Sequence, residues 1–355
     1  MSITIRLASL ADEEEQLIEI LDRNLPGRPN RKIQKRRHAN PLGPGWSWVA
    51  NPQGSNTIVA MASVVPRSFW VDGRKVVCGQ VVEFAVEAPF RSLGPAVLLQ
   101  RATFEPANSG EVAFCYDCPP HDRGMSTFVR LGLQSSCDVV RYALLLRSDE
   151  FLGKRLGRGA WTRPLVATAN AALGMRRSGR SADGVEIFRH DRPFDEEFSC
   201  LDQITSSLGT VRASRAAEEL NWRYLEDPFV PSGSSTANLG RWRVLVARRA
   251  GELVGFAVLF ILEDGTAWIG DLFSRNIAEF GGGLLEAVVD ICRQENVIRL
   301  DGLCSTDTSF SSLLEHAGFR ARERVYRVVA YENASQTAKL LNSDLHWTFT
   351  NFEVT

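Results

Sequence analysis

The sequence predicts an α+β protein made of two similar units in tandem. Segments that alternate apolar and polar residues, as strands do, are interleaved with segments whose apolar residues recur at helical spacing. This order occurs twice, in residues 1–148 and again in residues 221–335. A chain of 355 residues also has the length of about two ordinary domains. We expect residues 149–220 to connect the units and residues 336–355 to form a C-terminal tail.

The composition is typical of a cytoplasmic globular protein. Hydrophobic residues make up 44% of the chain, which supplies material for a core. The formal net charge of −1 argues against general nucleic-acid binding, which needs a surplus of basic residues. The odd number of scattered cysteines, 7, favours reduced thiols over a disulfide framework. The chain shows neither a signal-peptide pattern nor an apolar run of about 18 residues, so no transmembrane segment is expected.

The first unit opens with a predicted strand and helix. Residues 3–6 alternate in polarity, and the acidic residues 12–15 suit the start of the helix that follows. The densest basic run, residues 28–38, is either a solvated helix face or a landing surface for an anionic partner. Strands are then predicted at residues 46–50, 57–65, 68–71, 75–86, 112–116 and 139–146, with a short helix at residues 126–131.

Residues 81–101 hold the strongest functional signal. The apolar run VVEFAV has the length of a buried strand, and it ends before Pro89, which cannot continue a ladder. A helical pattern begins near Gly94 and Pro95, and proline suits an early helical position. The unpaired N–H groups of a first helical turn attract anions, and Arg91 could add charge-assisted contacts to a phosphate. A plain strand–turn–helix connection is the alternative.

This stretch resembles a known motif. The pattern Val86-x-x-Pro89-x-Arg91-x-x-Gly94-x-Ala96 is similar to the acyl-CoA pyrophosphate loop of the GNAT acyltransferases, (Arg/Gln)-x-x-Gly-x-(Gly/Ala). The segment at Phe128 to Leu133 lies where that family carries Tyr-x-x-Leu-Gly-Phe. The resemblance implies two GNAT-like domains, each a mixed, mostly antiparallel sheet flanked by helices. It also implies a cofactor site made of Phe84, Val86, Arg91, Ser92, Leu93, Gly94, Pro95 and Ala96.

The second unit repeats the layout without the loop. Strands are predicted at residues 242–248, 253–262, 267–273, 297–303 and 324–331, with helices at 278–296 and 309–316. The first of these helices is expected to be entered through Gly281, Gly282 and Gly283, which we interpret as loop residues. We therefore expect the first unit to bind acyl-CoA and the second to shape the acceptor site. Tyr224 and Asp271 are candidate acceptor-binding residues, although a cap or strand-end hydrogen bond is the commoner role of such side chains.

The resemblance implies direct attack of an amine on a thioester. Glu83 is the candidate general base, with a structural salt bridge as the alternative, and a backbone N–H near Phe84 to Val86 is the candidate oxyanion donor. The tyrosine that many family members use as the acid is replaced by Phe128. Either Tyr116 or His121 takes its place, or the thiolate leaves unassisted; His121 could instead contact pantetheine. Cys115 and Cys118 form a lone C-x-x-C, so no metal site is expected.

The resulting hypothesis is an acyl-CoA-dependent N-acyltransferase, with acetyl-CoA as the default co-substrate. Its acceptor would be a small-molecule amine, and resemblance suggests an amino-sugar or cell-envelope precursor. Alternatives are a FemX-like transferase that uses aminoacyl-tRNA, and transfer from an acyl carrier protein if Arg31 to Arg37 binds an acidic partner. A non-catalytic acyl-CoA-binding protein would fit the phenylalanine at position 128. The sequence does not determine the oligomeric state.

Overall fold

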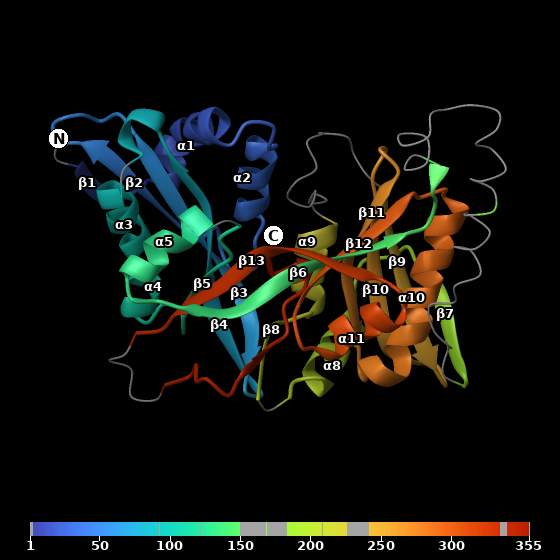
Figure 1. The fold of residues 1–355 in the computed structure, drawn as a ribbon. Helices are drawn as coiled ribbons and strands as arrows, with labels where there is room; N and C mark the ends of the chain where they lie inside the picture. Colours follow the sequence, from blue (N-terminus) through green and yellow to red (C-terminus); the bar gives the residue numbers. More distant parts are fainter. Residues whose placement is uncertain are drawn as a thin grey trace.

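The protein is described by a computed structural model. It describes residues 3–91, 93–120, 122–149, 168, 183–207, 209–225, 241–333 and 339–354. Within these residues no helix has both the length and the apolar character needed to cross a bilayer. Figure 1 shows two lobes side by side, with the C-terminus at the centre of the molecule.

The first lobe is a twisted sheet with helices on both faces. Helix α1 illustrates why its elements form: Leu17 and Leu21 are buried, whereas Asp12 and Glu13 occupy the first turn, where they complement the dipole. The chain runs through β1 (Ile3–Leu7), α1 (Leu10–Asn24), α2 (Asn30–His38), β2 (Trp46–Pro52), β3 (Ala60–Val71), β4 (Arg74–Val86), η1 (Ala88–Phe90), α3 (Leu93–Ala102), α4 (Glu105–Asn108), β5 (Cys115–Asp117), α5 (Asp122–Arg130) and β6 (Ser135–Leu145).

The second unit largely repeats this order, with β8 added between α8 and α9 and with β14 and α12 after the last long strand. Its strand β7 pairs with β9 along its length, so part of the predicted connector lies within the sheet. We propose that the second unit begins with β7. The chain runs through β7 (Val185–His190), α8 (Glu196–Ile204), β8 (Thr210–Ala213), α9 (Ala217–Tyr224), β9 (Arg241–Arg249), β10 (Glu252–Ile261), β11 (Thr266–Ser274), α10 (Ile277–Gln294), β12 (Arg299–Ser305), α11 (Ser309–His316), β13 (Arg320–Tyr331), β14 (His346–Trp347) and α12 (Asn351–Val354).

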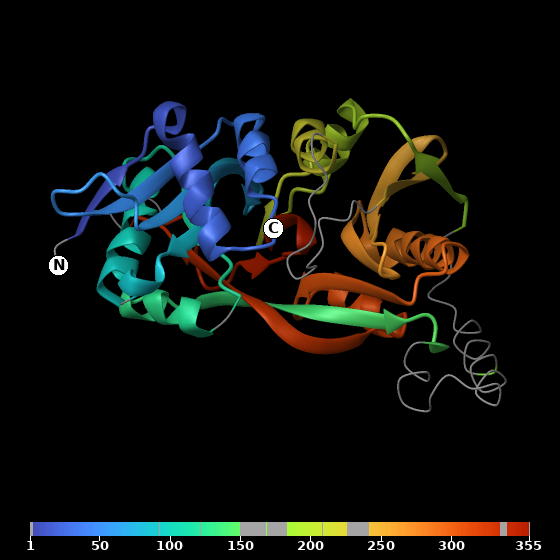
Figure 2. The same cartoon turned by 90° about the horizontal axis from the view of Figure 1, so that it is seen from above.

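The two units exchange their last strands. The strand order is β1-β2-β3-β4-β5-β13-β6-β12-β11-β10-β9-β7. Strand β13 of the second unit pairs with β5 of the first, and β6 of the first unit pairs with β12 of the second. Figure 2 shows β6 and β13 crossing together from one lobe to the other. Because backbone hydrogen bonds run through this crossing, the lobes form one continuous sheet.

The C-terminal segment returns to the centre of the molecule. Strand β14 pairs with β8, which in turn pairs with the end of β3 in the first unit. Phe349 and Phe352 are fully buried in an aromatic cluster with Phe69 and Tyr116. The expected tail is thus part of the core along residues 345–354.

The three consecutive glycines of the second unit lie inside a helix, so the prediction that they form its entry loop was wrong. Helix α10 begins at Ile277, where the side chain of Asn276 accepts a hydrogen bond from the N–H of Ala278. A Cβ at Gly281 would lie 2.8 Å from a methyl group of Leu313 on α11. Glycine at this position therefore permits the close approach of α10 and α11.

Candidate active site

A bulge in β4 opens the centre of the first unit. Met61 of β3 lies opposite Ala85, but Ser63 lies opposite Val82, so Glu83 and Phe84 together face a single residue of β3. Glu83 has a φ of +58°, a left-handed conformation that costs a non-glycine residue on the order of 1–2 kcal/mol. The extra residue leaves the ladder interrupted and turns the strand.

Strands β4 and β5 are paired over a short stretch and separate beyond it. They are paired in parallel at Gly79 with Cys115 and at Gln80 with Tyr116. On its other edge, β5 pairs with β13 from the second unit. The gap between the diverging strands leads into a cavity of about 350 Å³ that both units line.

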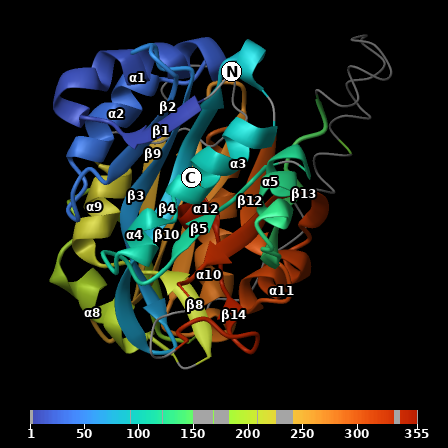
Figure 3. The ribbon, with the colours of Figure 1, turned by 90° about the vertical axis from the view of Figure 1, so that its left-hand side faces the viewer.

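Residues from both faces of the first sheet line the cavity. Figure 3 shows α1, α2 and α9 on one side of strands β2 to β4, and α3 and α5 on the other. Gln100, Gly124, Thr127 and Phe128 line the cavity on the α3 and α5 side. The opposite side and the central walls are lined by Leu25, Arg28, Ile33, Arg36, Arg37, Val65, Gln80, Val81, Val82, Glu83, Phe84, Asp117, Cys118, Pro119, Pro120, Trp222, Tyr326 and Val354.

Glu83, the predicted base, is held in a buried network. One carboxylate oxygen accepts from Gln34 Nε2 at 2.9 Å, and the other accepts from Arg37 Nη1 at 3.1 Å. Arg37 Nη1 also donates to the hydroxyls of Ser47 and Ser63. This is the salt bridge that the sequence offered as the alternative role, although Glu83 also lines the cavity. The network compensates for the strained backbone at the bulge.

Asp117 is a functional candidate that the sequence reasoning missed. Asp117 is half-buried at the end of β5, where the strands diverge, and it lines the cavity. Burial raises its pKa to about 7, an effect that a hydrogen bond with the backbone of Cys118 partly opposes. The signal in the sequence is a carboxylate that directly follows the predicted strand at residues 112–116. A pKa near neutrality suits a group that exchanges protons.

Of the two predicted general acids, Tyr116 and His121, the structure describes the first. The Tyr116 side chain is buried among the aromatic residues around Phe69, and its hydroxyl donates to the backbone oxygen of Glu353 at 3.0 Å. Burial raises its pKa well above the ordinary value. It is not among the residues that line the cavity. His121 lies outside the described residues.

The predicted pyrophosphate loop has the expected strand–turn–helix form. Arg91 braces this turn: its Nε donates to the carbonyl of Val86 at 2.8 Å and its Nη2 to Asn24 at 2.9 Å. Gly94 is exposed in the first turn of α3, and a Cβ there would meet nothing within 4 Å. Helix α3 begins at Leu93 and includes Pro95 and Ala96, whereas Ser92 lies outside the described residues.

The corresponding region of the second unit is closed by its own side chains. Asn276 caps α10, and Thr308 with Ser311 forms a capping box at the start of α11. A cavity of about 420 Å³ lies beside these termini. Because side chains already occupy first-turn N–H groups in both helices, this end of the second unit is less suited to an external phosphate.

Tyr224 and Asp271, the predicted acceptor ligands, are buried away from the cavity. The hydroxyl of Tyr224 donates to the carbonyl of Gly270 at 3.1 Å. Asp271 accepts from Arg215 Nε at 3.0 Å. Arg215 also pairs with Glu353, whose carboxylate accepts from the N–H of Thr350 at 2.7 Å. This buried network fixes α12 and thereby positions Val354 on the cavity wall.

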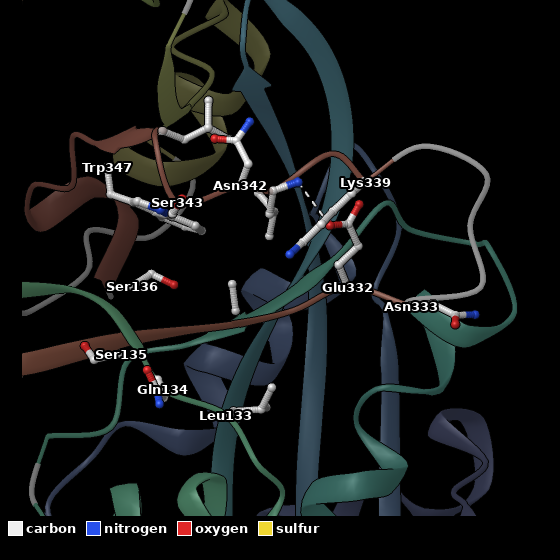
Figure 4. Close-up of a pocket in the computed structure, with 13 residues that line it drawn as sticks. Leu133, Gln134, Ser135, Ser136, Glu332, Asn333, Lys339, Asn342, Ser343 and Trp347 are labelled. Carbon is white, nitrogen blue, oxygen red and sulfur yellow. Dashed lines mark hydrogen bonds between the residues drawn. The ribbon is translucent and has the colours of Figure 1, made fainter.

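A wider cavity of about 630 Å³ lies elsewhere, between the start of β6, the end of β13 and the C-terminal segment. Figure 4 shows Glu332 and Lys339 on one side of it and Gln134 to Ser136 on the other. Glu332 accepts from the N–H groups of Leu340 and Leu341, so its charge serves to hold the chain. None of the predicted site residues lines this cavity.

The basic run is divided between the interior and the surface. Arg37 points inward to Glu83, whereas Arg31 pairs with Glu15 and His38 with Glu14 on the exposed side. The surface pairs of Arg31 and His38 agree with the solvated-face alternative, whereas a landing surface for an anionic partner stays a prediction. Within the described ranges, no group of three or more His, Cys, Asp or Glu side chains is arranged to hold a metal ion.

Comparison with known proteins places the fold. No protein-family model matches the sequence, and no match was found among curated proteins. Among solved structures, a GCN5-related N-acetyltransferase from Anabaena variabilis has a TM-score of 0.64 at 12% identity, covering 93% of this chain and 72% of that one. A similar protein from Kribbella flavida has a TM-score of 0.58 at 14% identity, covering 93% and 70%.

The N-myristoyltransferase of Saccharomyces cerevisiae with bound myristoyl-CoA is also similar, with a TM-score of 0.58 at 12% identity, covering 93% of this chain and 82% of that one. These likenesses confirm the predicted fold class, a mixed sheet flanked by helices in tandem units. The chain shares the fold of GCN5-related N-acetyltransferases and N-myristoyltransferases.

Proposed function

We propose that the protein is an acyl-CoA-dependent N-acyltransferase whose reaction takes place between β4 and β5. The observation that carries this proposal is the cavity lined by Glu83, at the bulge of β4, and by Asp117, in the same unit in which β4 leads through the Arg91 turn into α3. The fold of the comparison structures, one of which contains myristoyl-CoA, supports it. Acetyl-CoA is the default donor, and a cytoplasmic location remains a prediction.

The donor is proposed to approach from the α3 side. The pyrophosphate would bind at the first turn of α3, because backbone N–H groups there point outward and the helix dipole favours negative charge. The acyl group would then enter the cavity past Phe84 and Phe128. Arg91 would act chiefly by holding the turn, through its bonds to Val86 and Asn24.

The chemistry requires a neutral amine, a stabilised oxyanion and departure of a thiolate. We assign proton removal from the amine to Asp117, because this residue lines the cavity and its carboxyl group has a pKa raised to about 7. Glu83 remains a candidate for the general base. Its buried salt bridge with Arg37 also suits a role in holding the bulge of β4 in place. The backbone N–H near Phe84 would stabilise the oxyanion, since a bulge leaves ladder groups unpaired.

The leaving group places a smaller demand on the protein. A thiol has a pKa of about 8.5, so the thiolate can leave without a strong acid. Tyr116 would need to release its bond to Glu353 before it could donate a proton to the thiolate. The roles of Tyr116 and His121 as acids therefore remain predictions, as does an amino-sugar or envelope precursor as acceptor.

A bulky side chain at the loop should abolish donor binding. We expect Gly94→Trp to weaken acetyl-CoA binding by at least about tenfold, because the indole would cover the first turn of α3 while meeting no neighbouring atom at its Cβ. Calorimetric titration measures this directly. Arg101→Trp, an exposed position at the other end of α3, is the matched control and should bind normally.

The same titration separates the alternative functions. Binding of acetyl- or longer acyl-CoA without thiol release in the presence of amines would favour a non-catalytic acyl-CoA-binding protein. If the wild-type protein binds no acyl-CoA, the proposed function fails, and donors carried by a carrier protein or by tRNA become the better hypotheses.

A further inference from the structure

Apolar side chains of the first unit line the cavity on the side of helix α2. The hydroxyl of Ser63 accepts a hydrogen bond from Arg37 of α2, so this side chain points toward that helix. Val82 lies directly opposite Ser63 in the ladder, and Val65 follows Ser63 by two residues, so all three side chains share one face of the sheet. Ile33 lines the cavity from α2 itself, one helical turn before Arg37. The α2 side of the cavity therefore has an apolar wall made of Ile33, Val65 and Val82.

Two polar side chains beside this wall have their hydrogen bonds inside the protein. Glu83 forms its salt bridge with Arg37. Gln80 accepts from Arg67 Nη1 at 3.0 Å and donates to the backbone oxygen of Glu353 at 3.1 Å. A ligand that displaced these partners would leave a buried polar group unpaired, which costs more than a new hydrogen bond returns. Both side chains are therefore poor ligands for the body of an acceptor.

The side chains that α9 and the adjacent arginines contribute are occupied in the same way. Trp222 Nε1 donates to the backbone oxygen of Arg36 at 2.8 Å, and the guanidinium of Arg36 lies 5.6 Å from the centroid of the indole ring. Arg28 also lines the cavity, but it is exposed, so water solvates its charge. Ile33 and Val82 differ from these residues: they line the cavity and are only half-buried, so apolar surface remains available to a ligand. Covering that surface is favourable, because it removes apolar atoms from water.

We propose that the acceptor is a primary amine with an apolar body, a short alkyl or aryl group that packs against Ile33, Val65 and Val82. This inference rests on the proposed acyl transfer and names the class of its acceptor. The cavity of about 350 Å³ lies within the range of small-molecule sites, about 300–1,000 Å³, so it has room for such a group beside the acyl carbon. An amino-sugar fits this wall less well, because each of its hydroxyl groups would need a partner.

Apolar surroundings also suit the chemistry. An amine next to apolar side chains is harder to protonate than in water, which assists proton removal by Asp117 on the cavity wall. Asp117 takes the proton of the bound ammonium, the nitrogen bonds to the acyl carbon, and the carbon–sulfur bond breaks. The sulfur leaves with the electron pair and is protonated. The net products are an amide, the CoA thiol and a proton.

The test compares primary amines that differ in apolar surface. Thiol release from acetyl-CoA is measured with ethylamine, butylamine, hexylamine, aminoethoxyethanol and glucosamine. Aminoethoxyethanol has as many non-hydrogen atoms as hexylamine but carries two oxygens in place of carbons. We expect kcat/KM to rise along the alkyl series, by about three- to fourfold for each methylene group that becomes buried, and to be higher for hexylamine than for aminoethoxyethanol. The ether oxygen makes aminoethoxyethanol the weaker base, so basicity alone predicts the opposite order.

The outcomes separate this inference from the proposed function. A flat or falling alkyl series, or glucosamine or aminoethoxyethanol as the best substrate, would overturn the inference while leaving acyl transfer in place. Failure of the wild-type protein to bind acetyl-CoA, or to release thiol with every amine, would overturn both.

Variants then test the apolar wall. Val82→Thr exchanges a methyl group for a hydroxyl group of similar size, and Ile33→Thr makes the α2 side of the wall shorter and more polar. Each should lower kcat/KM for hexylamine by about threefold or more, with little change for aminoethoxyethanol. Ile204→Thr makes the same change at an exposed isoleucine of α8 that does not line the cavity, and is the control. Calorimetric titration with acetyl-CoA checks that each variant is folded. An unchanged preference for hexylamine in both Val82→Thr and Ile33→Thr contradicts the assignment.

Discussion

Replacing Asp117 with asparagine should lower kcat/KM for acyl transfer by about 10²- to 10⁴-fold, the usual contribution of a general base. The amide has nearly the same shape but cannot accept the proton of the amine. Acetyl-CoA binding should persist, because Asp117 lies at the end of β5 and not on the Arg91–Ala96 loop. Steady-state kinetics measures the loss of kcat/KM, and calorimetric titration measures whether acetyl-CoA binding persists. Asp138→Asn is the control and should retain full activity, because Asp138 is a half-buried carboxylate on β6 that pairs with Arg324 of β13 and does not line the cavity.

The pH dependence follows from the raised pKa of Asp117. In the wild-type protein, kcat/KM should rise with pH through about 7 as the base loses its proton, and this limb should be absent from Asp117→Asn. A rate limb that is unchanged in the variant would assign the proton transfer to another group, with Glu83 as the first to test.

The contribution of Asp117 to folding stability should fall as pH rises, whereas kcat/KM should increase. The folded state raises the pKa of Asp117, so its contribution to stability is fully present below the unfolded pKa of about 4 and is lost as pH rises through about 7. Above pH 7 the buried charge is a cost, on the order of 4 kcal/mol for a rise in pKa of about three units. Asp117→Asn should therefore unfold at a higher urea concentration than wild type at pH 8, and the two should converge near pH 4.

Replacing Arg215 with methionine should cost about 3–5 kcal/mol of unfolding free energy. Arg215 is 2% exposed and pairs with both Asp271 and Glu353, so its loss leaves two carboxylates buried without their cation. Burial raises the pKa of Asp271 even with Arg215 beside it. Urea denaturation measures the loss, and the variant should be destabilised more at pH 8 than at pH 5.

The same network gives this prediction its controls. Adding Asp271→Asn and Glu353→Gln to Arg215→Met should recover part of the stability, because the remaining charges are removed. Arg189→Met breaks an exposed pair with Asp191 and should cost less than about 1 kcal/mol. Equal losses in Arg189→Met and Arg215→Met would contradict the account of Arg215 as the buried centre of the C-terminal anchor.

The local elements of the donor loop could be predicted because their causes are local. Pro89 ends the strand pattern, and Gly94 with Pro95 marks the start of a helical run, so β4, the turn and α3 lie where expected. For Glu83 the sequence predicts a salt bridge as an alternative role but does not identify Arg37 as its partner. Its partner lies 46 residues away and meets it only because α2 packs across the bulge.

The features that escaped prediction depend on contacts between distant segments. Nothing in the local pattern of β6 or β13 indicates that each crosses to the other unit, since both alternate as ordinary strands. The burial of Phe349 and Phe352 depends on β8 offering an edge to the returning chain. Asp271 pairs with Arg215, and Tyr224 donates to the carbonyl of Gly270, so both side chains have partners inside the core. Their residue types suggested exposure to a ligand, which this packing does not provide.

Amide hydrogen exchange with and without acetyl-CoA tests the central claim most directly, because it reports where the donor binds. The account predicts slower exchange in peptides that cover residues 83–98 and 117–128, at the bulge, the α3 turn and α5. Peptides that cover residues 274–284 and 305–312, the corresponding ends of the second unit, should be unaffected. Protection confined to the second unit, or no protection at saturating acetyl-CoA, would contradict a donor site between β4 and β5.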